Sequence, residues 1–380
     1  MRRIYLDHAA TTPLAREVIE EMLPYLDKKY GNASSLHGFG IEANEALVNS
    51  RNKILKKLNG QRNFKCIFTS GGTESNNLAL KGIAFANQGK HIITTKVEHH
   101  CVLNACKWLE KEGFKVTYLD VDEEGFIDLE DLKKAIGKDT ILVSVIHGNN
   151  EIGTINPIRE IGEICRDKKV YFHTDACQSF TKVPIDLEKD NIDLLTINSH
   201  KIYGPKGVGA LVVRNGVKLT PLLHGGGHEF GLRSGTENVP GIVGFAKATE
   251  IIKQEDIEHM RKLRDRLIRG ILEIEKTRLN GPRKNRLCNN ANFSFRYIEG
   301  ESLVLHLDEK GIASSTGSAC SSKDLEPSHV LISIGLSPEE AHGSLRLTLG
   351  KDNTKEEIDY TIEAVKECVE RLRKMSPLGK

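Results

Sequence analysis

The sequence of 380 residues lacks several features that mark specialised classes of protein. No run of apolar residues approaches the roughly 18 needed to span a bilayer, and acidic Asp7 stands where a secretory signal would be apolar. Lys and Arg number 54 against 52 Asp and Glu, so the charge footprint of a nucleic-acid-binding protein is missing. We therefore expect a cytoplasmic globular protein that binds neither nucleic acid nor a membrane.

Cysteine is scarce and scattered. The eight cysteines form no CxxC pair and no dense framework, which argues against a zinc ribbon and against a disulfide scaffold. A metal site built from His224 and His228 is disfavoured, because the glycines between them are incompatible with helical i,i+4 geometry. We predict that the isolated protein contains no metal site.

Short apolar runs alternate with helical patterns over the first 250 residues. A capping Thr12 followed by Pro13 predicts the start of the first helix there. The alternation predicts an α/β fold with a mostly parallel central sheet covered by helices on both faces. The expected strands are 66–69, 92–95, 116–121, 141–146, 170–173, 194–197 and 208–213.

The pattern changes after about residue 238. Ile257, Met260, Leu263, Leu267 and Ile271 recur at three- and four-residue steps, which predicts a long amphipathic helix. A capping box of Thr354 and Glu357 predicts the start of the last helix. We predict a large α/β domain over 13–250 and a small α+β domain formed by 1–12 and 251–380.

Ligands of open parallel sheets bind beyond the carboxyl ends of the strands, so the residues that follow the apolar runs are informative. One strand breaks at Gly71 and Gly72 and enters a helix at Thr73, where amide N–H groups and the helix N-terminus favour a phosphate. An ordinary strand-to-helix turn fits that stretch equally well, because no Walker pattern with its lysine is present.

Two further strand ends carry charged residues. Asp175 follows the run 170–173, where a buried carboxylate requires a partner, although it could simply cap the next helix. Lys201 follows the run 194–197, although it could be an exposed loop lysine. Together, a phosphate cradle, a carboxylate for a pyridine nitrogen and an amine that bonds an aldehyde are what pyridoxal 5′-phosphate (PLP) requires.

The sequence resembles the fold-type I PLP enzymes of the aminotransferase class V group, and within them the class I cysteine desulfurases of the NifS/IscS type. The resemblance extends from Tyr5 to Leu378. It is carried by the stretches YLDHAATTP, YGNASSLHGFG, FTSGGTESNN, VEHHCV, NNEIGTI, HTDACQS, SHKIYGPKGVGAL, HGGGHEFGLRSGTEN, SSTGSACSS, AHGSLRLTLG and RLRKMSPL.

The resemblance implies a role for each matching residue near the cofactor ring. Lys201 would bond the cofactor and then move the Cα proton as base and acid. Asp175 would pair with the pyridinium nitrogen, and Gln178 would hydrogen-bond the phenolic oxygen. His99 would stack on the ring and assist proton transfer, and Asn150 would also contact the cofactor.

The phosphate would be held by residues from several segments. The resemblance assigns this role to Gly72, Thr73, Ser199 and His200, and to Thr236 from the other subunit of a homodimer. Asn198 also falls in this group, but the family usually has Ser at its position. An Asn side chain can still donate to a phosphate, so this departure affects a detail of the site.

The remaining roles concern the substrate, L-cysteine. Arg346, helped by Asn150, would grip the α-carboxylate with its planar fork. Cys320 lies in a stretch of small polar residues, which predicts an accessible thiol on a mobile loop. Its match to the nucleophile loop of the family implies that it attacks the substrate sulfur, so that alanine leaves and a Cys320 persulfide remains.

The expected function is therefore a PLP-dependent cysteine desulfurase that passes sulfur on for iron–sulfur cluster assembly, or also for tRNA thiolation. The expected acceptor is an IscU-type scaffold protein, on which Cys320 could contact a nascent cluster. Two alternatives stay open. One is another PLP enzyme of this fold, such as a selenocysteine lyase or an aminotransferase, and the other is a catalytically idle scaffold for iron–sulfur assembly.

Overall fold

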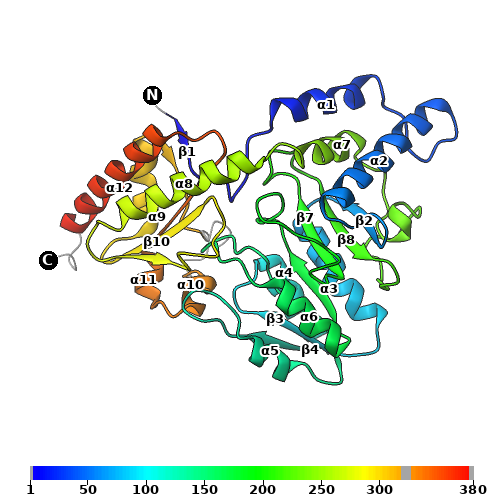
Figure 1. Ribbon diagram of the computed structural model, residues 1–380, viewed down its shortest axis with the longest axis horizontal. Coiled ribbons are helices and arrows are strands. Elements are labelled where there is room, and N and C mark those ends of the chain that lie inside the picture. The colour runs from blue at the N-terminus through cyan, green and yellow to red at the C-terminus, as the bar shows by residue number, and fades with distance from the viewer. Residues whose placement is uncertain (1–2, 318–326, 376–380) are drawn as a thin grey trace.

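The computed structural model describes residues 3–317 and 327–375. Its centre is a seven-stranded sheet in the order β2-β8-β7-β6-β5-β3-β4, in which only β8 runs antiparallel to its neighbours (Figure 1). The strands are β2 (Phe64–Thr69), β3 (His91–Thr95), β4 (Lys115–Leu119), β5 (Thr140–Ser144), β6 (Tyr171–Asp175), β7 (Leu194–Asn198) and β8 (Gly209–Arg214).

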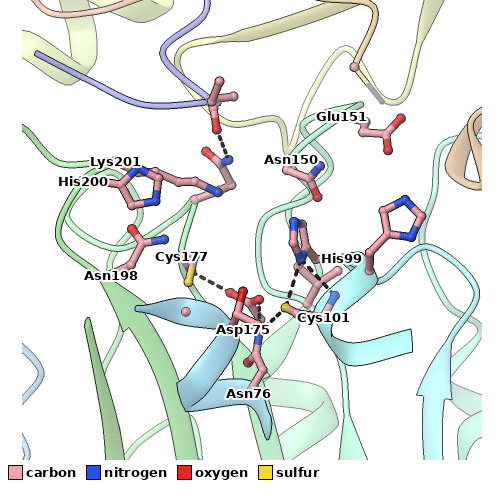
Figure 2. Close-up of a pocket in the computed structure, with 18 of the residues that line it drawn as sticks. Asn76, His99, Cys101, Asn150, Glu151, Asp175, Cys177, Asn198, His200 and Lys201 are labelled. Carbon is pink, nitrogen blue, oxygen red and sulfur yellow. Dashed lines mark hydrogen bonds between the residues drawn. The ribbon is translucent and has the colours of Figure 1, made fainter. Parts of the chain in front are cut away.

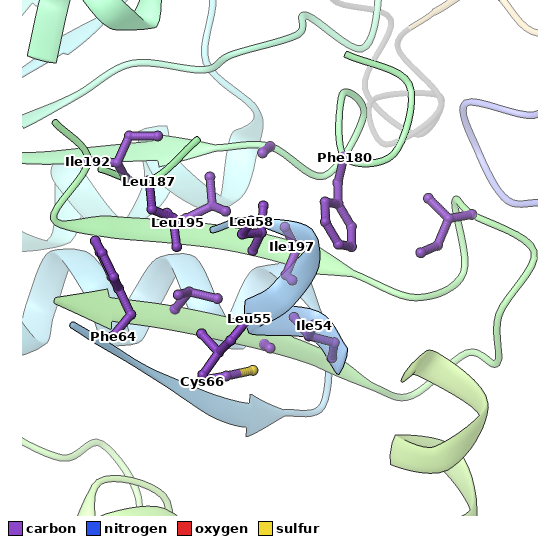
Figure 3. Packing of buried hydrophobic residues seen from close by; sticks show 14 of the residues in the cluster. Ile54, Leu55, Leu58, Phe64, Cys66, Phe180, Leu187, Ile192, Leu195 and Ile197 are labelled. Carbon is purple, nitrogen blue, oxygen red and sulfur yellow. The ribbon is translucent and has the colours of Figure 1, made fainter. Parts of the chain in front are cut away.

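Helices bury both faces of this sheet. Successive side chains of a strand point to opposite faces, so neighbouring apolar residues join different clusters. Leu194 packs in the cluster formed with α3 and α4, whereas its neighbour Leu195 packs in the cluster formed with α2 and α7. Figure 3 shows Ile54, Leu55 and Leu58 of α2 against the second face. The helices of this part are α1 (Arg16–Asp27), α2 (Gly38–Lys57), α3 (Gly72–Ala86), α4 (His100–Lys111), α5 (Leu129–Ala135), α6 (Ile158–Lys168) and α7 (Val239–Ala248).

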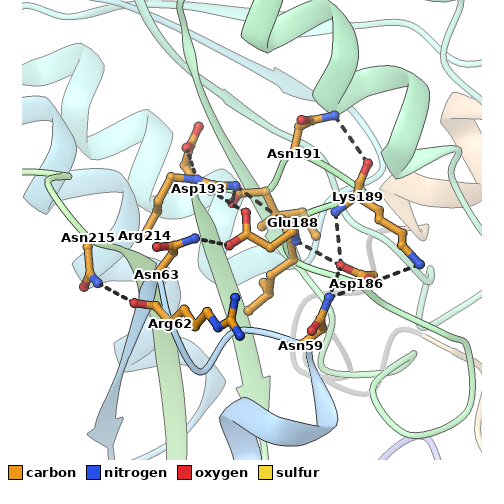
Figure 4. A network of polar contacts seen from close by, with 12 residues as sticks. Asn59, Arg62, Asn63, Asp186, Glu188, Lys189, Asn191, Asp193, Arg214 and Asn215 are labelled. Atoms are coloured by element: carbon orange, nitrogen blue, oxygen red, sulfur yellow. Dashed lines mark hydrogen bonds and ion pairs between the residues drawn. The ribbon is translucent and has the colours of Figure 1, made fainter.

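A polar network fixes the end of the sheet that lies away from the carboxyl ends of its parallel strands (Figure 4). Arg214 at the end of β8 donates to Asp193 at 3.1 Å and to Glu188 at 3.0 Å. Asn63 donates to the same Glu188 at 2.6 Å. This end is occupied by structural contacts, whereas the opposite end is available for a ligand.

The second part of the chain has its own core. A three-stranded antiparallel sheet, β12-β10-β9, packs with the C-terminal helix, and Ile4 and Leu6 from the start of the chain join the same apolar cluster. α8 bridges the two cores, since Met260 packs with the large cluster and Leu267 with the small one. The elements are β1 (Ile4–Tyr5), which pairs with β11 (Ile312–Ala313), η1 (Glu229–Gly231), α8 (Gln254–Ile271), β9 (Thr277–Asn280), β10 (Asn290–Phe295), α9 (Gly300–Glu309), α10 (His329–Ser333), α11 (Pro338–His342), β12 (Ser344–Thr348) and α12 (Lys355–Met375).

The α/β fold, the seven predicted strands and the two amphipathic helices are confirmed. The expected first helix is wrong at its start, because α1 begins at Arg16 and not at Pro13. The Thr12 hydroxyl instead donates to the carbonyl of His200 at 2.9 Å and accepts from the amide of Tyr203 at 2.7 Å. The division of the chain into domains at residues 12 and 250 stays a prediction.

Candidate active site

A cavity of about 270 Å³ lies at the carboxyl ends of β6 and β7, where the large sheet faces the second core (Figure 2). Segments far apart in the sequence meet in it. It is lined by Ala9, Ala10, Gly72, Thr73, Asn76, His99, His100, Cys101, Ile146, Asn150, Glu151, Asp175, Cys177, Gln178, Asn198, His200, Lys201, Gly317 and Arg346.

One wall offers a place for an anion. Gly71, the residue before α3, has φ +155°, which L side chains rarely adopt, and no side chain caps the helix. The first amide N–H groups of α3 are therefore available to a phosphate at the positive end of the helix. At the end of β7 and in the next residue, Asn198 Oδ1 and Ser199 Oγ are buried and have no hydrogen-bond partner among the described residues. The Ser199 hydroxyl and the Asn198 Nδ2 amide are donors that a ligand phosphate would accept from.

The carboxylate of Asp175 lies at the floor of the cavity and is 5% exposed. Asn76 Nδ2 donates to its Oδ2 at 2.7 Å, and the amide of Cys177 donates to its Oδ1 at 2.8 Å. Donors of this kind stabilise the charged carboxylate and fix its direction. A charged, oriented carboxylate suits a protonated pyridine nitrogen.

His99 is held at the start of α4. Its Nδ1 accepts from the amide of Cys101 at 3.2 Å and lies 2.9 Å from the Cys101 sulfur. Burial and then the nearby charge of Lys201 lower the pKa of His99 to about 4. The ring is therefore neutral at neutral pH, and its single proton lies on Nε2 because Nδ1 is an acceptor. A neutral imidazole is suited to stack on an aromatic cofactor.

Lys201 points toward the middle of the cavity in Figure 2. Its main-chain carbonyl accepts from the buried ammonium of Lys182 at 3.2 Å, and Lys182 also donates to the carbonyl of Gln178 at 3.0 Å. The Gln178 side chain donates to the carbonyl of Ala9 at 2.9 Å. His200 Nδ1 lies 3.2 Å from the Thr11 hydroxyl. The loop that carries Lys201 is thus tied both to the sheet and to the N-terminal segment.

Arg346 enters the cavity from β12 and is 3% exposed. Its Nη2 donates to the Asp7 carboxylate at 2.9 Å. Its Nη1 donates to the carbonyl of Asn150 at 3.0 Å and contacts the carbonyl of Gly317 at 3.4 Å. Its Nε is buried without a partner among the described residues. Asn150 Oδ1 is also buried without a hydrogen-bond partner among the described residues. The unpartnered Nε–H of a buried cation is suited to a carboxylate ligand, and the Asn150 Nδ2 amide is a further possible donor.

The structure thus brings ten of the predicted site residues into one cavity, namely Gly72, Thr73, His99, Asn150, Asp175, Gln178, Asn198, His200, Lys201 and Arg346. Ser199 is buried beside the cavity but does not line it, and exposed Thr236 does not line it in this chain. Cys320 lies outside the described residues. Sequence reasoning missed Asp7, Asn76, Cys101 and Glu151, all of which stand in the stretches that carry the resemblance.

The described residues contain neither a cluster suited to a metal ion nor a helix suited to cross a membrane. In 3–317 and 327–375, His, Cys, Asp and Glu side chains nowhere gather in groups of three that could hold a metal ion. Over the same ranges, each helix is too short or too polar to cross a bilayer.

Comparisons with known proteins agree with this geometry. Residues 4–361 match the family model "Aminotransferase class-V". A protein of Dictyoglomus turgidum named "Cysteine desulfurase IscS" is 55% identical over 382 residues, covering 99% of this chain and 97% of the relative. A solved structure described as "NIFS-LIKE PROTEIN" is 41% identical with a TM-score of 0.91, covering 98% of this chain and 100% of its own. Another, "SspA in complex with cysteine", is 38% identical with a TM-score of 0.82, covering 92% of this chain and 100% of its own.

Proposed function

Because the chain belongs to the aminotransferase class-V family and is a cysteine desulfurase like its IscS relatives, we propose that it binds PLP in the cavity described above and converts L-cysteine to alanine. The observation that carries this proposal is the convergence of Gly72, Asp175 and Lys201 on a single cavity. These three residues lie at or just after the ends of three separate strands, and only the fold brings them together.

The cavity fits the cofactor group by group. The uncapped start of α3, the Nδ2 amide of Asn198 and the unpartnered hydroxyl of Ser199 would hold the phosphate, helped by Thr73 and His200. Asp175 would keep a proton on the ring nitrogen, and Gln178 would reach the phenolic oxygen with the N–H that does not serve Ala9. When bound, PLP supplies an aldehyde that captures amines and a protonated ring that withdraws electrons.

The side chains of this chain then carry the remaining work. Arg346 binds the substrate carboxylate through donors that Asp7 and the carbonyls leave unused, beside the amide of Asn150. Lys201 takes the proton from Cα and later returns it. His99 keeps one face of the ring covered and presents Nε2–H.

Cys320 is the proposed sulfur acceptor. Its thiolate attacks the substrate sulfur, so that an S–S bond forms as the Cβ–S bond of cysteine breaks, and alanine leaves. We propose that the persulfide is passed to an IscU-type scaffold protein for iron–sulfur assembly. The cytoplasmic location expected from the sequence stays a prediction.

A homodimer is supported by apolar side chains that a single copy leaves exposed. Leu26, Tyr30 and Leu36, on and after α1, are 62%, 71% and 95% exposed. Large apolar side chains exposed to this extent are typical of a protein interface. Since Thr236 is exposed and does not line its own cavity, it is free to contribute to a second copy.

The decisive test is mass spectrometry of the purified holoenzyme after treatment with L-cysteine. One added sulfur on the peptide that contains Cys320, with alanine released, is the expected result. Cys320→Ala should abolish both while retaining the visible absorbance of bound cofactor. Alanine release that survives this substitution would favour another PLP enzyme of the same fold, and absence of cofactor absorbance would favour an idle scaffold.

A further inference from the structure

The segment 223–238, which contains Thr236, is held to the large sheet more firmly than its glycine content suggests. It closes on itself, because the amide of Ser234 donates to the carbonyl of Leu223 at 3.4 Å and the amide of Gly235 donates to His228 Nδ1 at 3.3 Å. We call it the glycine-rich segment. Two ion pairs connect it to the rest of the chain.

The first ion pair joins Arg51 of α2 to Glu229. Arg51 Nη1 and Nη2 donate to the two carboxylate oxygens at 2.8 and 2.9 Å, and the Glu229 side chain is 2% exposed. The same carboxylate accepts from the amide of Phe68 in β2 at 2.8 Å. The guanidinium lies 4.8 Å from the Phe68 ring centre and 4.9 Å from that of Phe230. A bidentate pair enclosed by two rings fixes geometry as well as charge.

The backbone at this point is strained. Glu229 and Phe230 have φ values of +48° and +62°, a conformation that costs residues other than glycine about 1 kcal/mol or more each. Such residues persist only where their surroundings hold them, and they are typical of functional positions. Here the surroundings are the Arg51 pair and the β2 amide, and they hold the start of the stretch that leads to Thr236.

The second ion pair joins the glycine-rich segment to the phosphate-binding turn of its own chain. Arg233 Nε donates to Glu74 Oε1 at 2.9 Å, and Glu74 Oε2 accepts from the amide of Ser70 at 2.7 Å. Ser70 and Glu74 flank Gly72 and Thr73, which line the cavity. The segment is therefore fixed between β2 and the turn, while Thr236 is left exposed.

We infer that the Arg51–Glu229 pair, supported by Arg233–Glu74, positions the glycine-rich segment so that Thr236 completes the phosphate site of a second copy of the chain. Arg51 and Glu229 would then be positioning residues that act on the partner's cavity and not on their own. This inference rests on the proposed function, because it requires a PLP-binding homodimer.

The first experiment replaces Arg51 by Met and measures the affinity of the apoprotein for PLP by titration. We expect the dissociation constant to rise at least tenfold while the dimer persists in analytical ultracentrifugation. Lys53→Met is the matched control, because Lys53 lies on the same helix and its pair with Glu250 is exposed and 3.9 Å long. Should Arg51→Met fail to fold, Glu229→Gln keeps the shape of the side chain and takes its place. An unchanged affinity in a folded variant would overturn the inference.

The second experiment uses mixed dimers with two affinity tags and follows the absorbance that depends on Lys201. In the first dimer, one copy carries Lys201→Ala and the other carries Arg51→Met. The copy with an intact Lys201 then receives Thr236 from the copy in which the Arg51–Glu229 pair is intact. We expect wild-type affinity. In the second, one copy carries both substitutions and the other none, and we expect the weakened affinity.

The opposite pattern, or equal weakening in both mixed dimers, would show that Arg51 acts within its own copy or by general destabilisation, and would overturn the inference. The proposed function fails separately. If the wild-type protein is monomeric or binds no PLP through Lys201, the proposed PLP-binding dimer is wrong and the inference falls with it. If the wild-type protein is a dimer with normal cofactor absorbance, the mixed dimers test only the role of the Arg51–Glu229 pair.

Discussion

The two walls of the cavity are built in different ways. The first wall holds Asp175 and Lys201 at or just beyond the ends of β6 and β7, neighbouring strands of one sheet that is buried on both faces. The second wall holds Arg346 on the small sheet, and its direction depends on Asp7, Asn150 and Gly317, which come from three other segments. We therefore expect changes on the first wall to abolish chemistry, and changes on the second to weaken substrate binding.

Lys201→Ala should have the largest effect, because it removes the amine that we propose bonds the cofactor and also serves as the acid–base group. We expect alanine release to fall by about 1000-fold or more. The measurement is alanine formed from L-cysteine at saturating PLP, with circular dichroism to establish folding. Lys206→Ala, an exposed lysine in the same loop, is the control. Comparable loss in Lys206→Ala would argue against a special role for Lys201.

Glu98→Gln tests how a buried group behind the cavity contributes to stability, because the Glu98 carboxyl group accepts from the amide of Ile146, which lines the cavity. Burial raises the pKa of Glu98 from its ordinary 4.5 to about 8. Between these two values the folded protein binds a proton that the unfolded chain lacks, so ionisation of Glu98 makes stability fall as pH rises from about 4.5 to about 8. The full difference is on the order of 5 kcal/mol. The Gln variant should lose this slope while retaining acceptors for the amide of Ile146.

The measurement for this prediction is urea unfolding of the apoprotein at pH values across that window. Glu163→Gln, a change of an exposed glutamate on α6, is the control and should keep the wild-type slope. A Glu98→Gln variant whose stability falls as steeply as that of the wild type would show that Glu98 is ionised in the folded protein throughout.

The first wall was predictable from the sequence for a physical reason. Parallel strands buried on both faces are continuous apolar runs, and their ends are marked by abrupt polar residues such as Asp175 and Lys201. The resemblance added Gln178, His99 and Arg346, which no run of hydrophobicity indicates. The strands were placed within two residues of their observed ends.

What the sequence could not predict are contacts between segments far apart in the chain. The donation from Asn76 to Asp175 joins α3 to β6, and the ion pair of Asp7 with Arg346 joins residues 339 positions apart. Thr12 has the residue type of a helix cap, but the fold uses its hydroxyl to hold the loop of Lys201. Local patterns contain no information about such long-range partners.

Arg346→Lys sharpens the contrast with the first wall. Lysine keeps the charge but loses the planar fork that serves Asp7, Asn150 and the substrate carboxylate together. We expect KM for L-cysteine to rise about 10- to 100-fold, corresponding to roughly 1.5–3 kcal/mol for lost hydrogen bonds to a charged group. The kcat should change much less. Steady-state kinetics measure both, and a fall in kcat at constant KM would place Arg346 in the chemical step instead.

Asp7→Asn should have the smallest effect of the four, because Asn can still accept from Arg346 Nη2 and only the charge of the pair is lost. The Arg346 side chain is 3% exposed and that of Asp7 is 19% exposed, so the pair is screened less than a surface pair and its loss matters more. We expect KM to rise about three- to tenfold with kcat nearly constant. Asp120→Asn, which removes the charge from an exposed pair with Lys96, should leave KM unchanged. If Asp7→Asn lowers kcat and leaves KM alone, the N-terminal segment serves the first wall, and the division between the two walls is wrong.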